Sequence, residues 1–304
     1  MLKLQSILVP VDLTGGSRYA YSIARDLAAK FHAAIHVLYV TPTAGPFEML
    51  FRRMGEGENA AVSEEHERSV LEALESDYGG YDPIKHVHRK GTSVAETVLA
   101  YADECEIDMI VMATRGHRGL EHPVLGGVTG DIVRHTTRPV LTVRTRSDER
   151  VDFGGFRRVA AAVDFAGESR EVVRAAKQIA SSYGASVTIL FVAEEHQVPV
   201  FSDTGLISVM TLKVDEEIAA RAADALKQLD EETGSSDLER DHVVLRGKPS
   251  REIVRYAEES GVDLIVIGRR GHSPHEGLLL GTVTEHVVRR SSCPVLTFGQ
   301  AEEE

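Results

Sequence analysis

The chain has 304 residues, of which 42% are hydrophobic and 27% charged, a composition typical of a folded protein large enough for two domains. Its formal net charge of -13 disfavours binding to nucleic acid or to an anionic membrane surface. The two cysteines exclude a disulfide framework, and no apolar run reaches the roughly 18 residues that span a bilayer. Because the N-terminus also runs directly into a strand-like pattern, we expect a soluble cytoplasmic protein.

The first half of the chain alternates short strand-like runs with amphipathic helical patterns. Strands are expected at about 6–11, 34–40, 84–88, 108–113 and 139–143, and helices at about 17–31, 60–77, 93–104 and 126–136. The run MIVMA within the fourth strand is apolar throughout, as expected for a parallel strand covered on both faces. The segments 41–60 and 193–212 are less regular, and we expect loops or broken helices that lie over a site.

The second half repeats the first. SILVPVDLTGG is answered by RVAAAVDFAGE, IDMIVMATRGH by VDLIVIGRRGH, and RPVLTV by CPVLTF. We therefore expect two homologous domains, at residues 1–146 and 156–300, joined by a charged linker. The strand and helix alternation predicts a tandem pair of Rossmann-like α/β domains, each a parallel sheet with right-handed crossovers and helices on both faces.

A glycine-rich loop follows the fourth strand of the second half. Gly268, Gly271 and Gly281 would let backbone N–H groups approach a bound group closely. Thr282 follows at the start of a helical pattern, where free N–H groups and the positive end of the helix dipole suit a phosphate. Asp164 ends the first strand and can accept hydrogen bonds from ribose hydroxyls. The loop lacks the P-loop pattern GxxxxGK[ST], so P-loop ATPase chemistry is not indicated.

These residues resemble the universal stress protein family, and the resemblance covers both halves. The nucleotide-binding members carry the pattern G-x2-G-x9-G-[ST], which the second half matches without a gap. The resemblance implies a five-stranded parallel sheet in the order 3-2-1-4-5 and an adenine nucleotide, usually ATP, between strands 1 and 4, with Mg²⁺ or Mn²⁺ as an optional companion. It implies that Asp164 and Val192 face the adenine or ribose. The nucleotide-binding residues expected in this half are Asp164, Val192, Gly268, Gly271, Gly281, Thr282, Val283 and Thr284.

The first half departs from that pattern at two positions. Ala113 stands where the second half has Gly268, and Gly127 stands where it has Thr282, which removes one hydroxyl donor but keeps the backbone N–H. The remaining positions expected to bind nucleotide in this half are Pro10, Asp12, Val40, Gly116, Gly126, Gly127, Val128 and Thr129. Nucleotide binding by one domain or by both is left open.

Structural roles compete with ligand binding at several of these residues. Thr282 and Glu285 match the T-x-x-E capping box, which by itself would explain the threonine. Asp12 and Asp164 could close a turn or cap the following helix, with Ser17 or Ser169 as the simpler helix caps. The loop histidines lack partners at convincing metal-ligand spacing, so no metal site is expected; they are His117, His122, His272 and His275.

Two functions remain open from the sequence. The first is a stress-response regulator that binds ATP or a related adenine nucleotide and acts on an unidentified protein partner. No residue is an evident general base, so we expect no catalytic residue and at most slow ATP hydrolysis or self-phosphorylation. The second is a nucleotide-free dimeric interaction module of the same family. The fifth strands, at 140–143 and 295–298, are expected to pair within the chain as a pseudo-dimer. Dimerisation of the whole chain is left open.

Overall fold

The computed structural model describes residues 3–43, 60–114, 127–144, 153–194, 196–201, 207–212, 216–234, 237–270 and 280–299. The chain divides into two compact units between Gly155 and Phe156. The domain limits expected from the sequence and the pairing of the two fifth strands stay predictions. Among the described residues, no helix is both long and apolar enough to cross a membrane.

The first unit is built on a parallel sheet. Its strands are β1 (Ser6–Val11), β2 (Ala34–Pro42), β3 (Ile84–Gly91), β4 (Met109–Ala113) and β5 (Val140–Val143). They lie in the order β3-β2-β1-β4-β5, with Ile7 opposite both Ile35 and Met109. The expected order 3-2-1-4-5 is therefore confirmed. β1 and β4 have fully buried side chains at their centres, as the apolar runs in the sequence predict.

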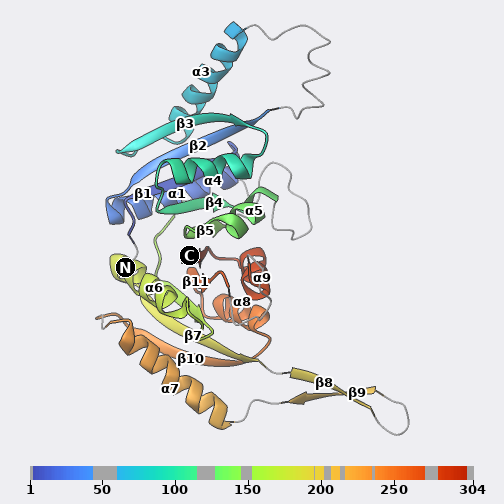
Figure 1. Cartoon of the computed structure of the whole chain (residues 1–304). Coiled ribbons are helices and arrows are strands. Elements are labelled where there is room, and N and C mark those ends of the chain that lie inside the picture. The colour runs from blue at the N-terminus through green and yellow to red at the C-terminus, as the bar shows by residue number, and fades with distance from the viewer. Residues whose placement is uncertain are drawn as a thin grey trace. The chain divides into compact units, whose positions relative to one another are not determined.

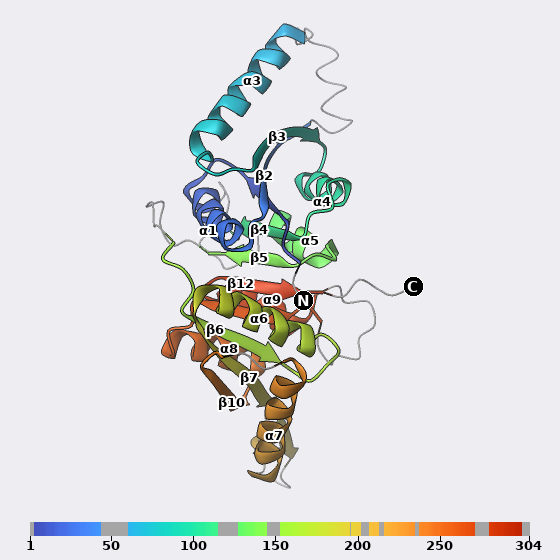
Figure 2. The same cartoon turned by 90° about the vertical axis from the view of Figure 1, so that its left-hand side faces the viewer.

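Helices cover both faces of this sheet. They are α1 (Gly15–Phe31), α3 (Ala60–Asp77), α4 (Val94–Glu104) and α5 (Gly127–His135). The expected apolar stripe of α1 is buried, with Ile23 and Leu27 among its members. α1 packs on β1 and β4, whereas α4 packs on β2 and β3 from the opposite face (Figure 2).

The second unit repeats this arrangement. Its main sheet contains β6 (Arg158–Val163), β7 (Ser186–Glu194), β10 (Arg240–Gly247), β11 (Leu264–Gly268) and β12 (Val295–Phe298). Its helices are α6 (Ser169–Tyr183), α7 (Glu216–Glu232), α8 (Pro249–Glu259) and α9 (Thr282–Arg290). The parallel strands lie in the order β10-β7-β6-β11-β12 (Figure 1).

The strand order reverses at β6. The chain moves from β6 through α6 to β7 on one side, and from β10 through α8 to β11 on the other. Right-handed crossovers then place α6 and α7 on one face and α8 and α9 on the opposite face. α6 accordingly packs on α7, and α8 packs on α9. A strand flanked in this way marks the crevice in which open parallel sheets bind ligands.

The segment 193–212 forms strands, so the expectation of loops or broken helices was wrong there. β7 continues to Glu194, and β8 (His196–Phe201) pairs in antiparallel fashion with β9 (Ile207–Leu212). The sequences HQVPVF and ISVMTL are rich in β-branched residues, and this preference outweighs the proline in β8. In the segment 41–60, β2 extends through Pro42, and residues 44–59 lie outside the described part of the chain.

A buried ion pair joins α6 to α7. Lys177 Nζ lies 2.5 Å from Asp230 Oδ1, and the two side chains are only 6% and 8% exposed. The same ammonium donates to the backbone oxygens of Asp230 and Gly234 at 2.6 and 2.7 Å and to Thr233 Oγ1 at 2.9 Å. His242 and Arg240, on β10, also contact the Asp230 carboxylate. The network therefore fixes α6 against α7 and β10.

Candidate functional site

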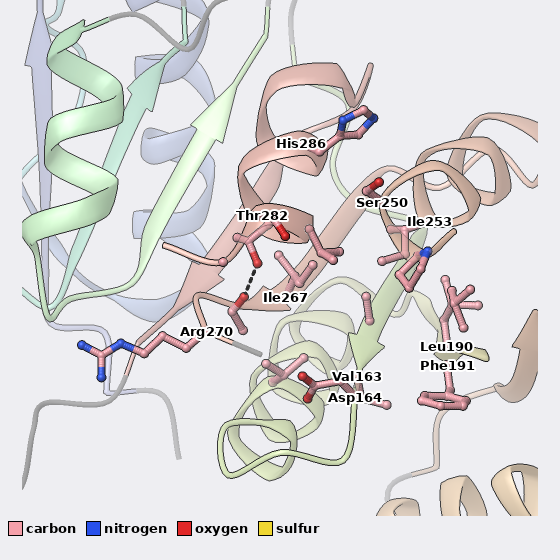
Figure 3. A pocket seen from close by; sticks show the side chains of 18 of the residues that line it. Val163, Asp164, Leu190, Phe191, Ser250, Ile253, Ile267, Arg270, Thr282 and His286 are labelled. Carbon is pink, nitrogen blue, oxygen red and sulfur yellow. Dashed lines mark hydrogen bonds between the residues drawn. The ribbon is translucent and has the colours of Figure 1, made fainter. Parts of the chain in front are cut away.

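A cavity of about 960 Å³ opens at the carboxyl ends of β6, β7 and β11 in the second unit (Figure 3). It lies at the point where the strand order reverses, and its volume is within the usual range for small-molecule sites. Most of the residues expected to bind nucleotide line this one cavity: Asp164, Val192, Gly268, Gly281, Thr282, Val283 and Thr284. Gly271 lies outside the described residues.

Apolar side chains form much of the wall. They come from three strands and from α8: Val163, Leu190, Phe191, Val192, Ile253 and Ile267. The ring of Phe165 lies 4.8 Å, centroid to centroid, from the ring of Phe191. The sequence analysis did not single out this aromatic pair, because the phenylalanines come from two separate strand ends. The wall suits a flat apolar ring system.

Asp164 closes the turn that follows β6. Its Oδ1 accepts hydrogen bonds from Ala166 N at 3.0 Å and from Ser169 Oγ at 3.3 Å. The turn alternative for this aspartate is therefore confirmed. The expectation that Ser169 caps α6 was wrong, because Ser169 is the first helical residue and its hydroxyl bonds Asp164 instead. Asp164 also lines the cavity, so its carboxylate lies within reach of a ligand.

α9 begins at the cavity without the expected capping box. Gly281 is the N-cap and Thr282 the first helical residue, with no side-chain hydrogen bond at the cap. Glu285 contributes its backbone N–H, which donates to Gly281 O at 2.9 Å. The capping-box hypothesis was therefore wrong, because the helix begins at Thr282, one residue earlier than that pattern requires. The exposed Thr282 is left available for another role.

Two hydrogen bonds fix the start of α9 against the end of β11. Thr284 Oγ1 donates to Gly268 O at 2.7 Å, and Thr284 is 3% exposed. Gly281 N donates to Arg269 O at 2.8 Å, which brings the two ends of the glycine loop together. The Thr284 hydroxyl thus has a structural role. The first-turn N–H groups of Thr282 and Val283 have no intrahelical acceptor and face the cavity end of the helix.

Two polar residues of the cavity were missed by the sequence analysis. Ser250, in the first turn of α8, is 4% exposed, and its hydroxyl has no hydrogen-bond partner among the described residues. Figure 3 shows Ser250 and His286 toward the same end of the cavity, with Asp164 toward the other. Comparison of the two halves could have signalled Ser250, since the buried residue at its place in α4 is Ala95.

His286 lies in cationic surroundings. Burial lowers its pKa below 6.5, and the charges of nearby basic residues lower it further: Arg289, Arg290, Lys248 and Arg251. His286 is therefore neutral at pH 7 and can donate or accept a hydrogen bond. Two of these basic residues, Lys248 and Arg289, also line the cavity and add positive charge to its wall.

The first unit places its corresponding residues at equivalent positions. Asp12 Oδ1 accepts from Thr14 N and Thr14 Oγ1 at 3.2 and 2.6 Å, so it too closes a turn. Thr14, rather than the expected Ser17, caps α1. Thr129 Oγ1 donates to Ala113 O at 3.1 Å and so repeats the bond of Thr284.

The remaining positions of the first unit lie around the same strand ends. Pro10 lies near the end of β1, Val40 is buried in β2, and Val128 is exposed in the first turn of α5. Gly127 begins α5, and a Cβ at this position would meet no other heavy atom within 4 Å among the described residues, apart from its chain neighbours and the backbone of its own helix. Both Gly116 and Gly126 lie outside the described residues.

The loop histidines also fall outside the described part of the chain; they are His117, His122, His272 and His275. Within the described ranges, no group of three or more histidine, cysteine or carboxylate side chains is placed to hold a metal ion.

Comparisons with known proteins agree with the internal repeat. The profile of the Universal stress protein family matches residues 3–144 and again residues 155–298. Universal stress protein Slr1230 of Synechocystis is 23% identical over 97% of this chain and 100% of its own length. Universal stress protein YxiE of Bacillus subtilis is 32% identical over 46% of this chain and 97% of its own length. The crystal structure of a universal stress protein from Archaeoglobus fulgidus matches 97% of this chain and 98% of its own chain, with a TM-score of 0.66 and 20% identity. The chain therefore belongs to the universal stress protein family and carries two copies of its domain in tandem.

Proposed function

We propose that the second unit binds ATP or a related adenine nucleotide, and that the protein is a stress-response regulator with little or no turnover. The observation that carries this proposal is the combination, in one cavity, of an apolar wall and the N-terminal end of α9. The wall would hold the base, and the helix end would hold the phosphates.

The base would lie against the side chains of β7, β11 and α8. Val192 and Ile267 are 7% and 6% exposed, so they form a fixed surface rather than a flexible one. Ser250 and the neutral His286 would supply hydrogen bonds to ring nitrogens or to an exocyclic amine. Asp164, whose turn holds it at the end of β6, would accept from a ribose hydroxyl.

The phosphates would lie at the first turn of α9. The N–H groups of Thr282 and Val283 and the positive end of the helix dipole suit an anion there. Gly281 has φ −67° and ψ 145°, a conformation that any residue adopts, so backbone geometry does not explain the glycine. Under this proposal, the glycine leaves space for a phosphate beside the helix end.

A regulatory role fits the chemistry of the site better than catalysis. Both Asp164 and Glu168, acidic residues of the cavity, already accept hydrogen bonds from the protein backbone. With these two carboxylates engaged in backbone hydrogen bonds, the proposal is that the nucleotide persists as a bound signal. β7 lines the cavity and leads within one residue into the β8–β9 hairpin, which could report occupancy to a protein partner.

The nucleotide-free module is the competing function, and Gly127 favours it for the first unit. Gly127 offers a backbone N–H but no hydroxyl at the start of α5. The two functions are separated by denaturing the purified protein and identifying released small molecules by mass and by adenine absorbance. Adenine nucleotide near one equivalent per chain supports the proposal. Its absence, together with no binding of added ATP or AMP, would establish the nucleotide-free module.

A further inference from the structure

A buried carboxylate lies at the phosphate end of the cavity. Glu168 is 9% exposed, precedes α6 and lines the cavity, although the sequence analysis did not single it out. Its Oε2 accepts a hydrogen bond from Arg270 N at 3.1 Å. Arg270 is the second residue of the glycine loop after β11. The carboxylate therefore occupies a backbone donor that an anionic ligand in the glycine loop would otherwise approach.

The carboxylate also explains Gly268. A Cβ at Gly268 would lie 2.6 Å from Glu168 Oε2 and 3.4 Å from Glu168 Cβ, so the Glu168 carboxylate would have to shift to admit a larger residue. In the first half, Ala113 replaces Gly268 and Gly16 replaces Glu168. The second half thus combines a glycine at the strand end with a glutamate, whereas the first half combines an alanine with a glycine. The first glycine of the loop makes room for Glu168, and this pairing distinguishes the second unit from the first.

The negative charge of Glu168 repels an anionic group that binds beside it. Figure 3 shows the Arg270 side chain directed away from Asp164 and Ser250, so Arg270 meets the cavity through its backbone. Arg269 is 5% exposed. Burial lowers the pKa of its guanidinium, and the charge of Glu168 raises it, so the two groups interact. This guanidinium offsets part of the negative charge but does not free the Arg270 N–H. Each additional phosphate brought to this end would meet a carboxylate in a partly desolvated site.

We propose that Glu168 makes the second-unit cavity discriminate against phosphate-rich nucleotides, so that it favours a nucleoside monophosphate over a triphosphate. The inference rests on the proposed nucleotide function and names the ligand class of that site. AMP carries its charge on one phosphate, whereas ATP would bring two further charged phosphates to the start of α9, where Arg270 N and Glu168 lie. The carboxylate should therefore weaken ATP binding more than AMP binding.

The test compares AMP and ATP by isothermal titration, without divalent cation, in the full chain and in Glu168→Gln. Glutamine has nearly the same volume and retains one carbonyl oxygen that can accept from Arg270 N, while it removes the negative charge. To assign the signal to the second unit, both proteins also carry Gly126→Val, a substitution at the first-half counterpart of Gly281 that is intended to block any binding by the first unit. Glu194→Gln is the matched control, since Glu194 also lines the cavity but is exposed. Thermal unfolding confirms that each variant folds.

Glu168→Gln should tighten ATP binding roughly tenfold, about 1.4 kcal/mol, and change AMP binding less than about twofold. Glu194→Gln should leave the affinities for ATP and AMP nearly unchanged, because solvent screens the charge of Glu194. Equal changes in the affinities for ATP and AMP in Glu168→Gln, or no change in either, would overturn the inference. So would weaker binding of Mg²⁺-loaded ATP in Glu168→Gln, which would make Glu168 a cation ligand. If neither nucleotide binds the unaltered cavity or the variant, the proposed function itself fails, and this inference fails with it.

Discussion

Replacement of Asp230 by asparagine tests whether the buried ion pair holds the second unit together. Asparagine keeps the shape of the side chain but leaves the Lys177 ammonium without its counter-charge at 2.5 Å. Three neutral oxygens still surround Nζ, so the hydrogen bonds persist while the charge becomes uncompensated. Removing one partner of a buried pair costs about 3–5 kcal/mol. For a unit of about 150 residues, this lowers the melting temperature by about 6–20 °C.

Differential scanning calorimetry at pH 7 measures the effect. The control is Glu232→Gln, which breaks the exposed Arg170–Glu232 pair between the same two helices. We expect a large decrease in the melting temperature for Asp230→Asn and a value close to the unmodified protein for Glu232→Gln. Equal melting temperatures for the two variants would refute the argument from burial.

The same pair predicts a pH dependence. Burial alone would raise the pKa of Asp230, but the hydrogen bond and charge of Lys177, with Arg240 and His242, lower it below 3.8. A lowered folded-state pKa gives a stabilisation that is fully present above the unfolded-state value and is lost as pH falls through the folded-state value. The difference in unfolding free energy between the unmodified protein and Asp230→Asn should therefore narrow below about pH 4. A difference that stays constant between pH 7 and pH 3 would contradict this assignment.

Three further variants probe the nucleotide site. Thr282→Ala should weaken ATP binding roughly two- to tenfold through a lost donor but leave the melting temperature unchanged, because Thr282 does not cap α9. A lower melting temperature with equal affinity would restore the capping role. Gly127→Thr, which has open space for its side chain, should strengthen ATP binding by the first unit, and titration showing no gain would exclude a phosphate beside α5. Ser250→Ala should weaken ATP binding roughly two- to tenfold without loss of thermal stability, since the Ser250 hydroxyl lines the cavity and lacks a hydrogen-bond partner among the described residues. Unchanged ATP affinity in this variant would show that Ser250 does not contact the base.

Periodicity and the internal repeat predicted most of the architecture. The strands at 6–11 and 109–113 and the helix at 60–77 were located within one or two residues, because continuous apolar runs and 3.6-residue spacing report burial directly. The β8–β9 hairpin was missed because a proline and polar residues obscured its β-branched alternation.

The site was harder to predict than the fold. Motif spacing located the glycine loop, but it could not show that helix α9 begins at Thr282 and so excludes a capping box. Glu168 and Ser250 join the cavity only when the chain folds, since Glu168 directly precedes α6 and Ser250 lies in α8. Comparison of the two halves distinguishes both residues, because the first half has Gly16 in place of Glu168 and Ala95 in place of Ser250. The roles proposed for these two residues depend on their burial and contacts in the folded structure, which cannot be derived from motif spacing.

The central claim is that an adenine nucleotide binds in the second-unit cavity at the start of α9. Its most direct test is isothermal titration of ATP and AMP into the full chain and into Gly281→Val. Valine is compatible with the backbone of Gly281 but would fill the space beside the helix end, where the phosphates are proposed to lie. We predict saturable binding by the unmodified chain and loss of the second-unit site in Gly281→Val, with thermal unfolding unchanged. Unaltered affinity and stoichiometry in a folded Gly281→Val protein would contradict the claim.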